Sequence, residues 1–136
     1  MNNLDLWQAW LAEAQAILNE ARERYGEKRY HRVVRLCQEA VELAQKSLLM
    51  YCGVDVPREH DLSSVVDKLD LVQEKLKLQK RRELRRRSHR LARKRLVSFY
   101  GAEDGTPASA LFSPGDADQA LTDAESVIAA VRELTE

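Results

Sequence analysis

The sequence predicts an all-α protein, an up-and-down antiparallel four-helix bundle with one additional short helix. Apolar residues recur at three- and four-residue steps through most of the chain, and no stretch shows the strict alternation of a half-buried strand. Gly and Pro punctuate the stretches between these segments, and short links favour antiparallel neighbours. A length of 136 residues suits one core, so residues 1–136 are expected to form a single domain.

Two long helices are expected in the first part of the chain. The first covers about residues 4–24 and ends at a Tyr-Gly pair. The second covers about residues 30–53 and has a broad apolar face made of Val33, Val34, Cys37, Ala40, Val41, Ala44, Leu48 and Tyr51. We expect Trp7, Trp10 and this second helix to form the centre of the bundle.

The middle of the chain is also helical in pattern. Asp61 is expected to cap a helix, because its carboxylate can accept a hydrogen bond from the free amides of the first turn. Apolar residues continue at helical spacing to Leu76 and then more thinly, while the Lys and Arg content favours a solvated helix. We therefore expect a long helix, with room for one break, that reaches about Phe99.

The last helix has a clear start signal. A loop with several Gly and Pro residues covers residues 101–115. Ser113 and Asp116 have the spacing of a capping box, and Pro114 between them suits a first helical turn. The buried face of this helix is expected to contain Ala117, Ala120, Leu121, Ala124, Val127, Ile128, Val131 and Leu134.

Charge is distributed unevenly although the formal net charge is zero. Residues 75–95 hold twelve Lys or Arg and one acid, Glu83, whereas residues 103–136 hold eight acids and one base, Arg132. Arginine clusters on a helix bind phosphate well, because the guanidinium offers forked donors and stays charged. They can equally pair with the acidic last helix, in the same subunit or a partner, and the sequence does not choose between these two roles.

Other features argue against membrane and metal chemistry. No apolar run approaches the roughly 20 residues of a membrane-spanning helix, and the N-terminus lacks a basic signal-peptide start, so a cytoplasmic protein is expected. Cys37 lies on an apolar stripe and Cys52 near a helix end, neither in a metal-binding spacing, and both are expected to be reduced structural thiols. We expect no metal and no cofactor, and we interpret His60 as a residue of a helix start.

A set of short motifs links the chain to a known family. In order along the sequence they are Cys37-Gln38-Glu39-Ala40, Glu42, Lys46, Gly53, Pro57, His60-Asp61-Leu62, and the segment from Arg95 to Gly101. Together with the closing helix from Asp116 they resemble the HEPN family, the nucleotide-binding helical domain of higher eukaryotes and prokaryotes, over roughly the whole chain. The resemblance implies a HEPN fold, a homodimer, and association with a small nucleotidyltransferase in a toxin–antitoxin module.

The resemblance also directs attention to one catalytic motif. Catalytic members of the family carry an Arg, four to six residues and then a His, and two such pairs meet across a dimer to cut RNA. Here Arg95 is followed after four residues by Tyr100, a poor general base because a phenol has a pKa of about 10. Arg82 and His89, with six residues between them, make a looser match within the arginine-rich run.

Binding residues are expected in two places. Arg90, Arg93 and Arg95 adjoin Phe99 and Tyr100, and a basic and aromatic combination of this kind is typical of contacts to nucleotides or nucleic acid. In a HEPN-like bundle the second helix borders the nucleotide groove, which adds three weaker candidates, Gln38, Glu39 and Glu42.

The leading functional prediction is a homodimeric protein that binds nucleotide or RNA phosphate beside a nucleotidyltransferase partner, with no robust catalysis of its own. Two alternatives stay open. One is a metal-independent endoribonuclease toxin that uses Arg95 with Tyr100, or Arg82 with His89, at the dimer interface. The other is a purely structural module that docks its basic helix onto acidic partner surfaces.

Overall fold

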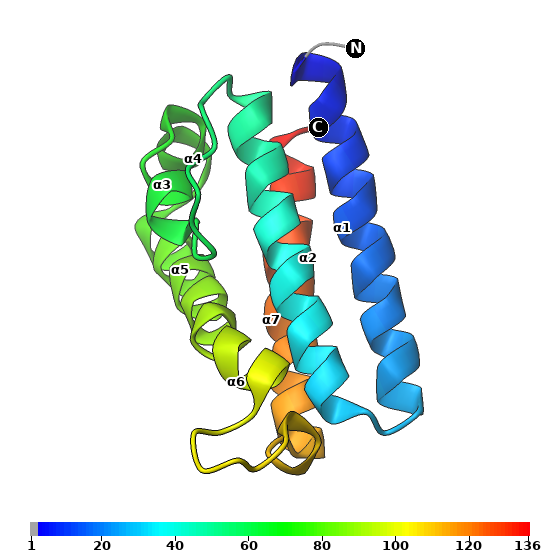
Figure 1. The fold of residues 1–136 in the computed structure, drawn as a ribbon. Helices are drawn as coiled ribbons and strands as arrows, with labels where there is room; N and C mark the ends of the chain where they lie inside the picture. Colours follow the sequence, from blue (N-terminus) through cyan, green and yellow to red (C-terminus); the bar gives the residue numbers. More distant parts are fainter. Residues whose placement is uncertain (1–2) are drawn as a thin grey trace.

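A computed structural model describes residues 3–136, and this part of the chain is all-helical, as predicted. Seven α-helices and one 3-10 turn follow one another: α1 (Asn3–Gly26), α2 (Tyr30–Tyr51), α3 (Ser63–Asp67), α4 (Asp70–Lys75), α5 (Leu78–Arg93), α6 (Arg95–Tyr100), η1 (Ala108–Ala110) and α7 (Pro114–Leu134). The long helices form the predicted bundle, with short helices added at one side (Figure 1).

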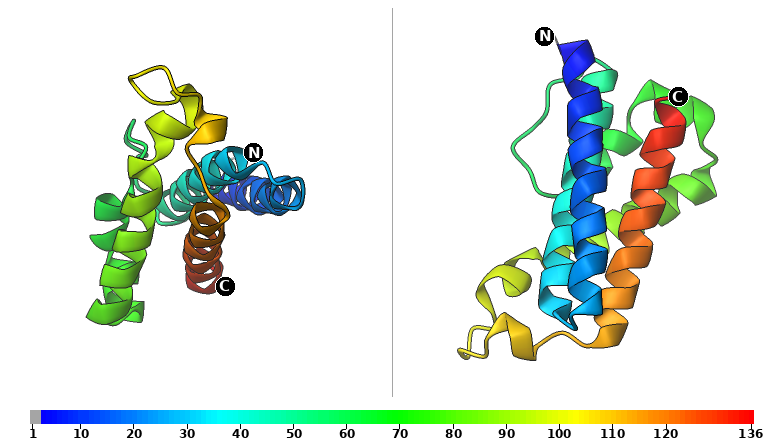
Figure 2. Two further views of the ribbon diagram at one scale, coloured as in Figure 1. Left: turned by 90° about the horizontal axis from the view of Figure 1, so that it is seen from below. Right: turned by 90° about the vertical axis from the view of Figure 1, so that its right-hand side faces the viewer.

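Helix α2 is the central element. It packs against α1 on one side and α7 on another, while the more inclined α5 packs against both α7 and α2 (Figures 1 and 2). The core is accordingly built from the α2 stripe and the small residues of α7 that approach it, among them Val33, Val34, Ala40, Ala120 and Ala124, all at most 1% exposed. Helices α1 and α7 bring the two ends of the chain to the same end of the bundle (Figure 1).

The two tryptophans are less central than expected. Trp7 is half-buried and packs edge-on against Tyr51 with 5.0 Å between ring centroids. Trp10 is 36% exposed, so the prediction that it forms the centre is wrong. The reason is that α1 covers only one side of α2, and its smaller residues Ala14 and Ala21 make the close approach.

The start and end signals of the helices are mostly confirmed. Gly53 adopts a left-handed φ of 71° just after α2, and the next amide, that of Val54, bonds back to the Leu49 carbonyl at 2.9 Å. Ser113 caps α7 in a capping box with Asp116. The prediction that Asp61 caps α3 is wrong in position, because the N-cap residue is Leu62 and it has no side-chain cap. Asp61 lies one residue earlier, and its carboxylate accepts a hydrogen bond of 3.1 Å from the backbone amide of Ser63, the first residue of α3.

The long helix expected to reach Phe99 is instead four helices, α3 to α6. Extended backbone at Leu69, and again at Leu76 and Lys77, separates the first three, and Lys94 separates α5 from α6. A continuous helix over residues 62–99 would be about 57 Å long, whereas the 22 residues of α2 span only about 33 Å. The chain therefore folds back after α4, and the short helices bury Leu69 and Val72 against the bundle.

Two further points limit the functional classes. No helix in residues 3–136 is both long enough and apolar enough to cross a membrane. A cavity of about 30 Å³, lined mainly by apolar side chains of α2, α3, α4, α5 and α7, lies inside the bundle. It has room for about one water molecule.

Candidate nucleic-acid interface

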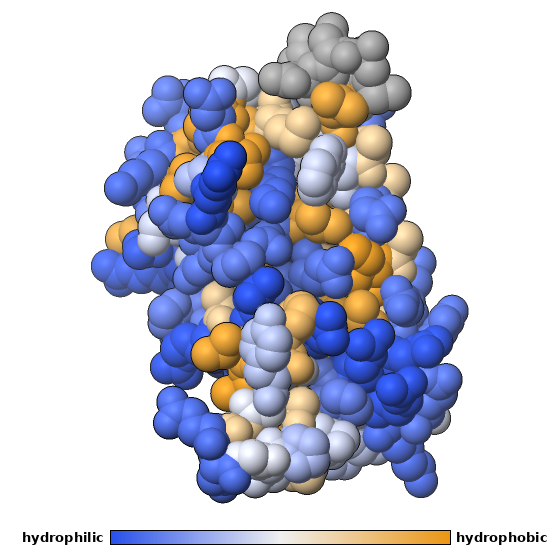
Figure 3. Space-filling model, viewed as in Figure 1, coloured by the Kyte–Doolittle hydropathy of each residue, from blue (hydrophilic) through white to orange (hydrophobic). Residues whose placement is uncertain are grey.

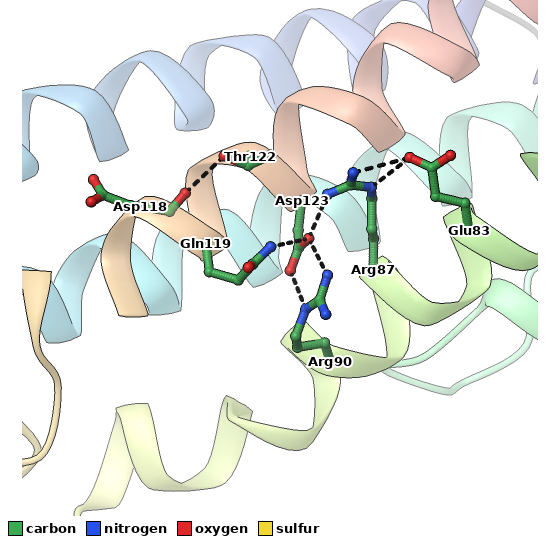
Figure 4. A network of polar contacts seen from close by, with 7 residues as sticks. All are labelled: Glu83, Arg87, Arg90, Asp118, Gln119, Thr122 and Asp123. Atoms are coloured by element: carbon green, nitrogen blue, oxygen red, sulfur yellow. Dashed lines mark hydrogen bonds and ion pairs between the residues drawn. The ribbon is translucent and has the colours of Figure 1, made fainter. Parts of the chain in front are cut away.

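Helix α5 carries two basic stripes that face different ways. The inner stripe is Arg87 and Arg90, and both guanidinium groups reach the carboxylate of Asp123 on α7 (Figure 4). The distances are 2.9 Å from Arg87 Nη1 to Oδ1, 2.8 Å from Arg90 Nε to Oδ2, and 2.7 Å from Arg90 Nη2 to Oδ1. The amide of Gln119 adds a fourth hydrogen bond to Asp123, at 3.0 Å.

This cluster holds α5 onto α7. Asp123 is fully buried, and a buried carboxylate is stable only when its lone pairs are satisfied. The hydrogen bond to Asp123 raises the pKa of Arg90, while Arg87 also pairs with Glu83 at 3.0 Å and lowers the pKa of that acid. Pairing of the basic run with the last helix in the same subunit is therefore confirmed for these two arginines. Arg90, a predicted phosphate contact, has its guanidinium committed to the fold.

The outer stripe consists of Arg82, Arg86, His89 and Arg93. These residues follow one another at steps of four, three and four, which places them on one face of α5, and all four are exposed. Among the residues that the structure describes, none of its three arginines forms an ion pair with an acid. Three unneutralised guanidinium groups therefore line one exposed helix face.

A groove runs along the first part of this stripe. It has a volume of about 1100 Å³ and lies between α5 and the start of α3. The α5 side supplies Leu78, Gln79, Arg82, Arg85, Arg86 and His89, and the α3 side supplies Asp61, Ser63 and Ser64. Arg85 also approaches Asp67 at 3.7 Å, with half of its side chain exposed.

Asp61 organises the wall of the groove. Its Oδ1 accepts hydrogen bonds from the Ser63 hydroxyl at 2.6 Å and the Ser88 hydroxyl at 3.2 Å, and its Oδ2 lies 3.1 Å from His89 Nδ1. Ser88 in turn receives a bond of 3.0 Å from the buried amide of Gln45 on α2. Burial acts to raise the pKa of Asp61, but the bonds from Ser63, His89 and Ser88 outweigh it and lower that pKa.

This geometry orients the His89 imidazole. A carboxylate at Nδ1 favours the tautomer with its proton on that nitrogen, which leaves Nε2 as the acceptor. The ring is 61% exposed, so Nε2 is open to a ligand in the groove. Sequence reasoning missed the part of Asp61 in this site, because 28 residues separate Asp61 from His89 and no local spacing signals the contact.

The candidates on α2 hold the linker that precedes α3. Glu42 Oε1 lies 2.7 Å from His60 Nδ1, and the buried Gln38 amide donates to the His60 carbonyl at 3.4 Å. Glu39 is half-buried. Gln38 and Glu42 thus fix the residues next to Asp61, so they act on the groove through the linker and do not line it.

Sequence comparison assigns the family. The family model of the HEPN domain matches residues 7–134. The chain belongs to the HEPN domain family. The match begins within α1 and reaches the last residue of α7, and it includes both stripes of α5 and the Asp61 that precedes α3.

Two solved structures share this fold over the whole chain. The crystal structure of TT1696 from Thermus thermophilus aligns with a TM-score of 0.80 and 23% identity, covering 98% of this chain and 99% of that one. ST0689, an archaeal HEPN homologue, aligns with a TM-score of 0.77 and 21% identity over 100% of both chains. No curated protein matches the sequence. At these identities the likeness establishes the fold alone.

The remaining predicted residues of this HEPN domain lie on α6 and beside it. Arg95 of α6 and Arg35 of α2 both approach the ring of Phe99. Their guanidinium carbons lie 4.8 Å and 3.6 Å, respectively, from the ring centroid. Tyr100 is 76% exposed, and its ring lies 6.0 Å from that of Phe99. Neither Arg95 nor Tyr100 lines the groove, whereas Arg82 and His89 do. Of the two predicted pairs, only Arg82 and His89 both line this groove.

In the part of the chain that the structure describes, no three His, Cys, Asp or Glu side chains gather closely enough to hold a metal ion. Cys37 is buried in the core, as expected, and burial raises the pKa of its thiol to about 12. Cys52 is half-buried and also reduced. The Cys37 thiol, with a pKa of about 12, is inert as a nucleophile at neutral pH.

Proposed function

We propose that this HEPN domain binds RNA through its phosphates, and that the groove beside α5 is the binding site. The observation that carries the proposal is the outer stripe, where Arg82, Arg86 and Arg93 are exposed and lack an acidic partner within residues 3–136. Unpaired guanidinium groups along one face attract a phosphate backbone and release its counterions on binding. His89 adds a further hydrogen-bonding group on the same face.

The inner stripe strengthens this assignment. Arg87 and Arg90 both donate hydrogen bonds to Asp123, which fixes the rotation of α5 about its own axis. The outer stripe must therefore point away from α7. An evenly solvated basic helix would leave all its arginines free to pair with nearby acids. Here the two roles that the sequence left open are divided between two faces of one helix.

The test is binding of a labelled RNA, followed by fluorescence anisotropy at several salt concentrations. Wild type is expected to bind with a log–log salt slope of about −0.7 per phosphate contact, as for single strands. Arg82→Ala and Arg86→Ala should each weaken binding and reduce that slope by about 0.7. Arg22→Ala on α1, which removes an arginine that pairs with Glu125 and does not line the groove, serves as the control. Equal losses in all three variants would overturn the site.

Metal-independent RNA cleavage is the second candidate, and one observation favours it. His89 is hydrogen-bonded to Asp61 in the same groove as Arg82. In such a reaction Nε2 of His89 would accept the proton of a ribose 2′-hydroxyl as that oxygen bonds to the neighbouring phosphorus. The bond from phosphorus to the 5′-oxygen would break, this oxygen would take a proton from water, and Arg82 would stabilise charge on the phosphate. Cleavage in EDTA that disappears in His89→Ala would support this candidate. Cleavage that disappears only in Arg95→Ala or Tyr100→Phe would place the catalytic residues on α6. If the RNA stays intact, the cleavage candidate is refuted and only the binding function stands.

The partners of this HEPN domain remain proposals based on the family. We propose a homodimer and a nucleotidyltransferase partner in a toxin–antitoxin module, with a cytoplasmic location; family membership supports these assignments. Sedimentation of the purified protein tests the dimer, and co-purification with the product of a neighbouring nucleotidyltransferase gene tests the partner. A purely structural role for the basic helix predicts an assembly that dissociates at high salt and ignores RNA.

A further inference from the structure

Helix α6, which follows α5 in the chain, carries exposed apolar and aromatic side chains. Beyond Arg93, the same three- and four-residue steps lead to Leu96, Val97 and Tyr100, which are 64%, 36% and 76% exposed. Only Lys94, itself in a right-handed helical conformation, separates the two helices. The exposed aromatic ring of Tyr100 therefore follows the basic stripe in the chain.

The ring next to it is occupied. Phe99 has the guanidinium groups of Arg35 and Arg95 at 3.6 and 4.8 Å from its centroid, so it has little free surface for a ligand. Tyr100 lies 6.0 Å away at an interplanar angle of 40°, and most of its ring is open. Tyr100 is thus the available aromatic surface in a basic environment.

The charges around Phe99 lack a counterion of their own. Arg35 and Arg95 form no ion pair with any acid of the described residues, although two positive charges share one ring. An aromatic face attracts each cation, but it does not neutralise the repulsion between them. A phosphate placed between or beside these guanidinium groups would remove that repulsion.

We propose that Tyr100 stacks on a base of single-stranded RNA whose phosphates contact Arg35 and Arg95, so that the strand runs from the groove along α5 onto α6. This inference rests on the proposed function and narrows its substrate to single strands, because a paired base cannot offer its face to a side chain. Every aromatic base has such a face, so the contact is indifferent to sequence.

The surroundings favour RNA over a protein partner at this place. The apolar residues of α6 are few, and Arg35 and Arg95 approach Phe99 of the same helix. The neighbouring residues in the chain, Arg93 and Lys94, are also basic, and Lys94 pairs with Asp116 at 4.0 Å. In the view of Figure 1, hydrophobic surface occurs in small groups separated by hydrophilic residues (Figure 3). A protein interface core is normally broader and depleted of charge.

The test uses anisotropy with a labelled oligouridylate of about 10 nucleotides, a typical length for single-strand sites. Two further probes carry one abasic nucleotide near the 5′ or the 3′ end, and a blunt RNA duplex of the same length completes the set. The variants are Tyr100→Ala, Tyr100→Phe, which keeps the stacking face, and Val54→Ala, which shortens an exposed apolar side chain elsewhere.

Tyr100→Ala is expected to bind the intact oligouridylate at least about 5-fold more weakly, the lower range for loss of a stacked base. Tyr100→Phe and Val54→Ala should bind like wild type. Wild type should bind one of the two abasic probes as weakly as Tyr100→Ala binds the intact oligouridylate. For that probe, Tyr100→Ala should lower the affinity no further. Wild type should also bind the duplex more weakly than the single strand.

Tight wild-type binding that Arg82→Ala weakens and Tyr100→Ala does not would overturn the stacking contact and leave the proposed function standing. The stacking contact is equally overturned if Tyr100→Ala weakens both abasic probes as much as the intact strand. If wild type binds no RNA at low salt, the proposed function and this inference fall together.

Discussion

Removal of the Asp123 carboxylate tests whether its ion pairs with Arg87 and Arg90 stabilise the packing of α5 against α7. Asp123→Ala would leave Arg87 and Arg90 facing α7 without the acceptor that now takes hydrogen bonds of 2.7 to 2.9 Å. Loss of one member of a buried ion pair costs about 3–5 kcal/mol, because the other member stays buried and unpaired. The side chains of Arg87 and Arg90 are 20% and 36% exposed, so both can reach water after a small movement.

We therefore expect the lower end of that range, a fall of about 3 kcal/mol in the free energy of unfolding. That is a large share of the roughly 5–15 kcal/mol typical of a domain, and it corresponds to a melting temperature about 10 °C lower. Urea unfolding followed by circular dichroism measures the change, with the slope against urea checked for constancy. Glu125→Ala is the control, since its pair with Arg22 is about half exposed and should cost under about 1 kcal/mol.

A double-mutant cycle then separates the pair from its surroundings. The losses in the free energy of unfolding caused by Asp123→Ala and Arg90→Ala should be strongly non-additive. Once Asp123 is gone, the Arg90 charge has lost its partner, so its removal should cost little more. Replacing Asp123, Arg87 and Arg90 together by Leu and Met should recover most of the loss. A fall below about 1 kcal/mol in Asp123→Ala, or additive single changes, would refute the view that this cluster holds α5 in place.

Two further predictions concern Asp61 and the turn after α6. Burial raises the pKa of Asp61 but hydrogen bonds from Ser63 and from α5 lower it overall, so its stabilising effect is present above the unfolded value of about 3.9 and is lost as the pH falls through the lower folded value. Unfolding curves between about pH 5 and pH 2 should therefore converge for wild type and Asp61→Asn; parallel curves would contradict this. Gly101→Ala should cost at least about 2 kcal/mol, because φ is 79° and a Cβ would lie 2.4 Å from the Thr106 carbonyl oxygen. Gly105→Ala, with a φ of 93° and open space, should cost less in the same thermal melts.

The helices and their boundaries were predictable where the signal is local. The left-handed residue after α2 is a glycine, and the capping box of α7 is a four-residue motif, so both can be identified in the sequence. The breaks at Leu69 and Leu76 could not be found this way, since neither residue is a helix breaker. They arise because the segment is longer than the bundle it has to cover, which is a property of the whole fold.

The candidate site was predictable in composition and not in geometry. The basic run was visible, but nothing in it shows which arginines face α7. One signal was present in the last helix, where Asp123 interrupts a small-residue stripe between Ala120 and Val127. A buried acid at such a position requires cationic partners, and α5 is the element that supplies them. The contact of Asp61 with His89 joins distant segments and had no local signal.

The division of α5 into two faces changes how its variants must be interpreted. We expect a change at an arginine of the inner stripe to weaken the proposed RNA binding only by loosening the helix, because Arg87 and Arg90 hold α5 against α7. An arginine of the outer stripe has no such task, so its loss should leave the unfolding curve almost unchanged. Weak RNA binding by an Arg90 variant would therefore identify no contact unless its stability is intact. The same loss in Arg86→Ala, at unchanged stability, can come only from the ligand side of the helix.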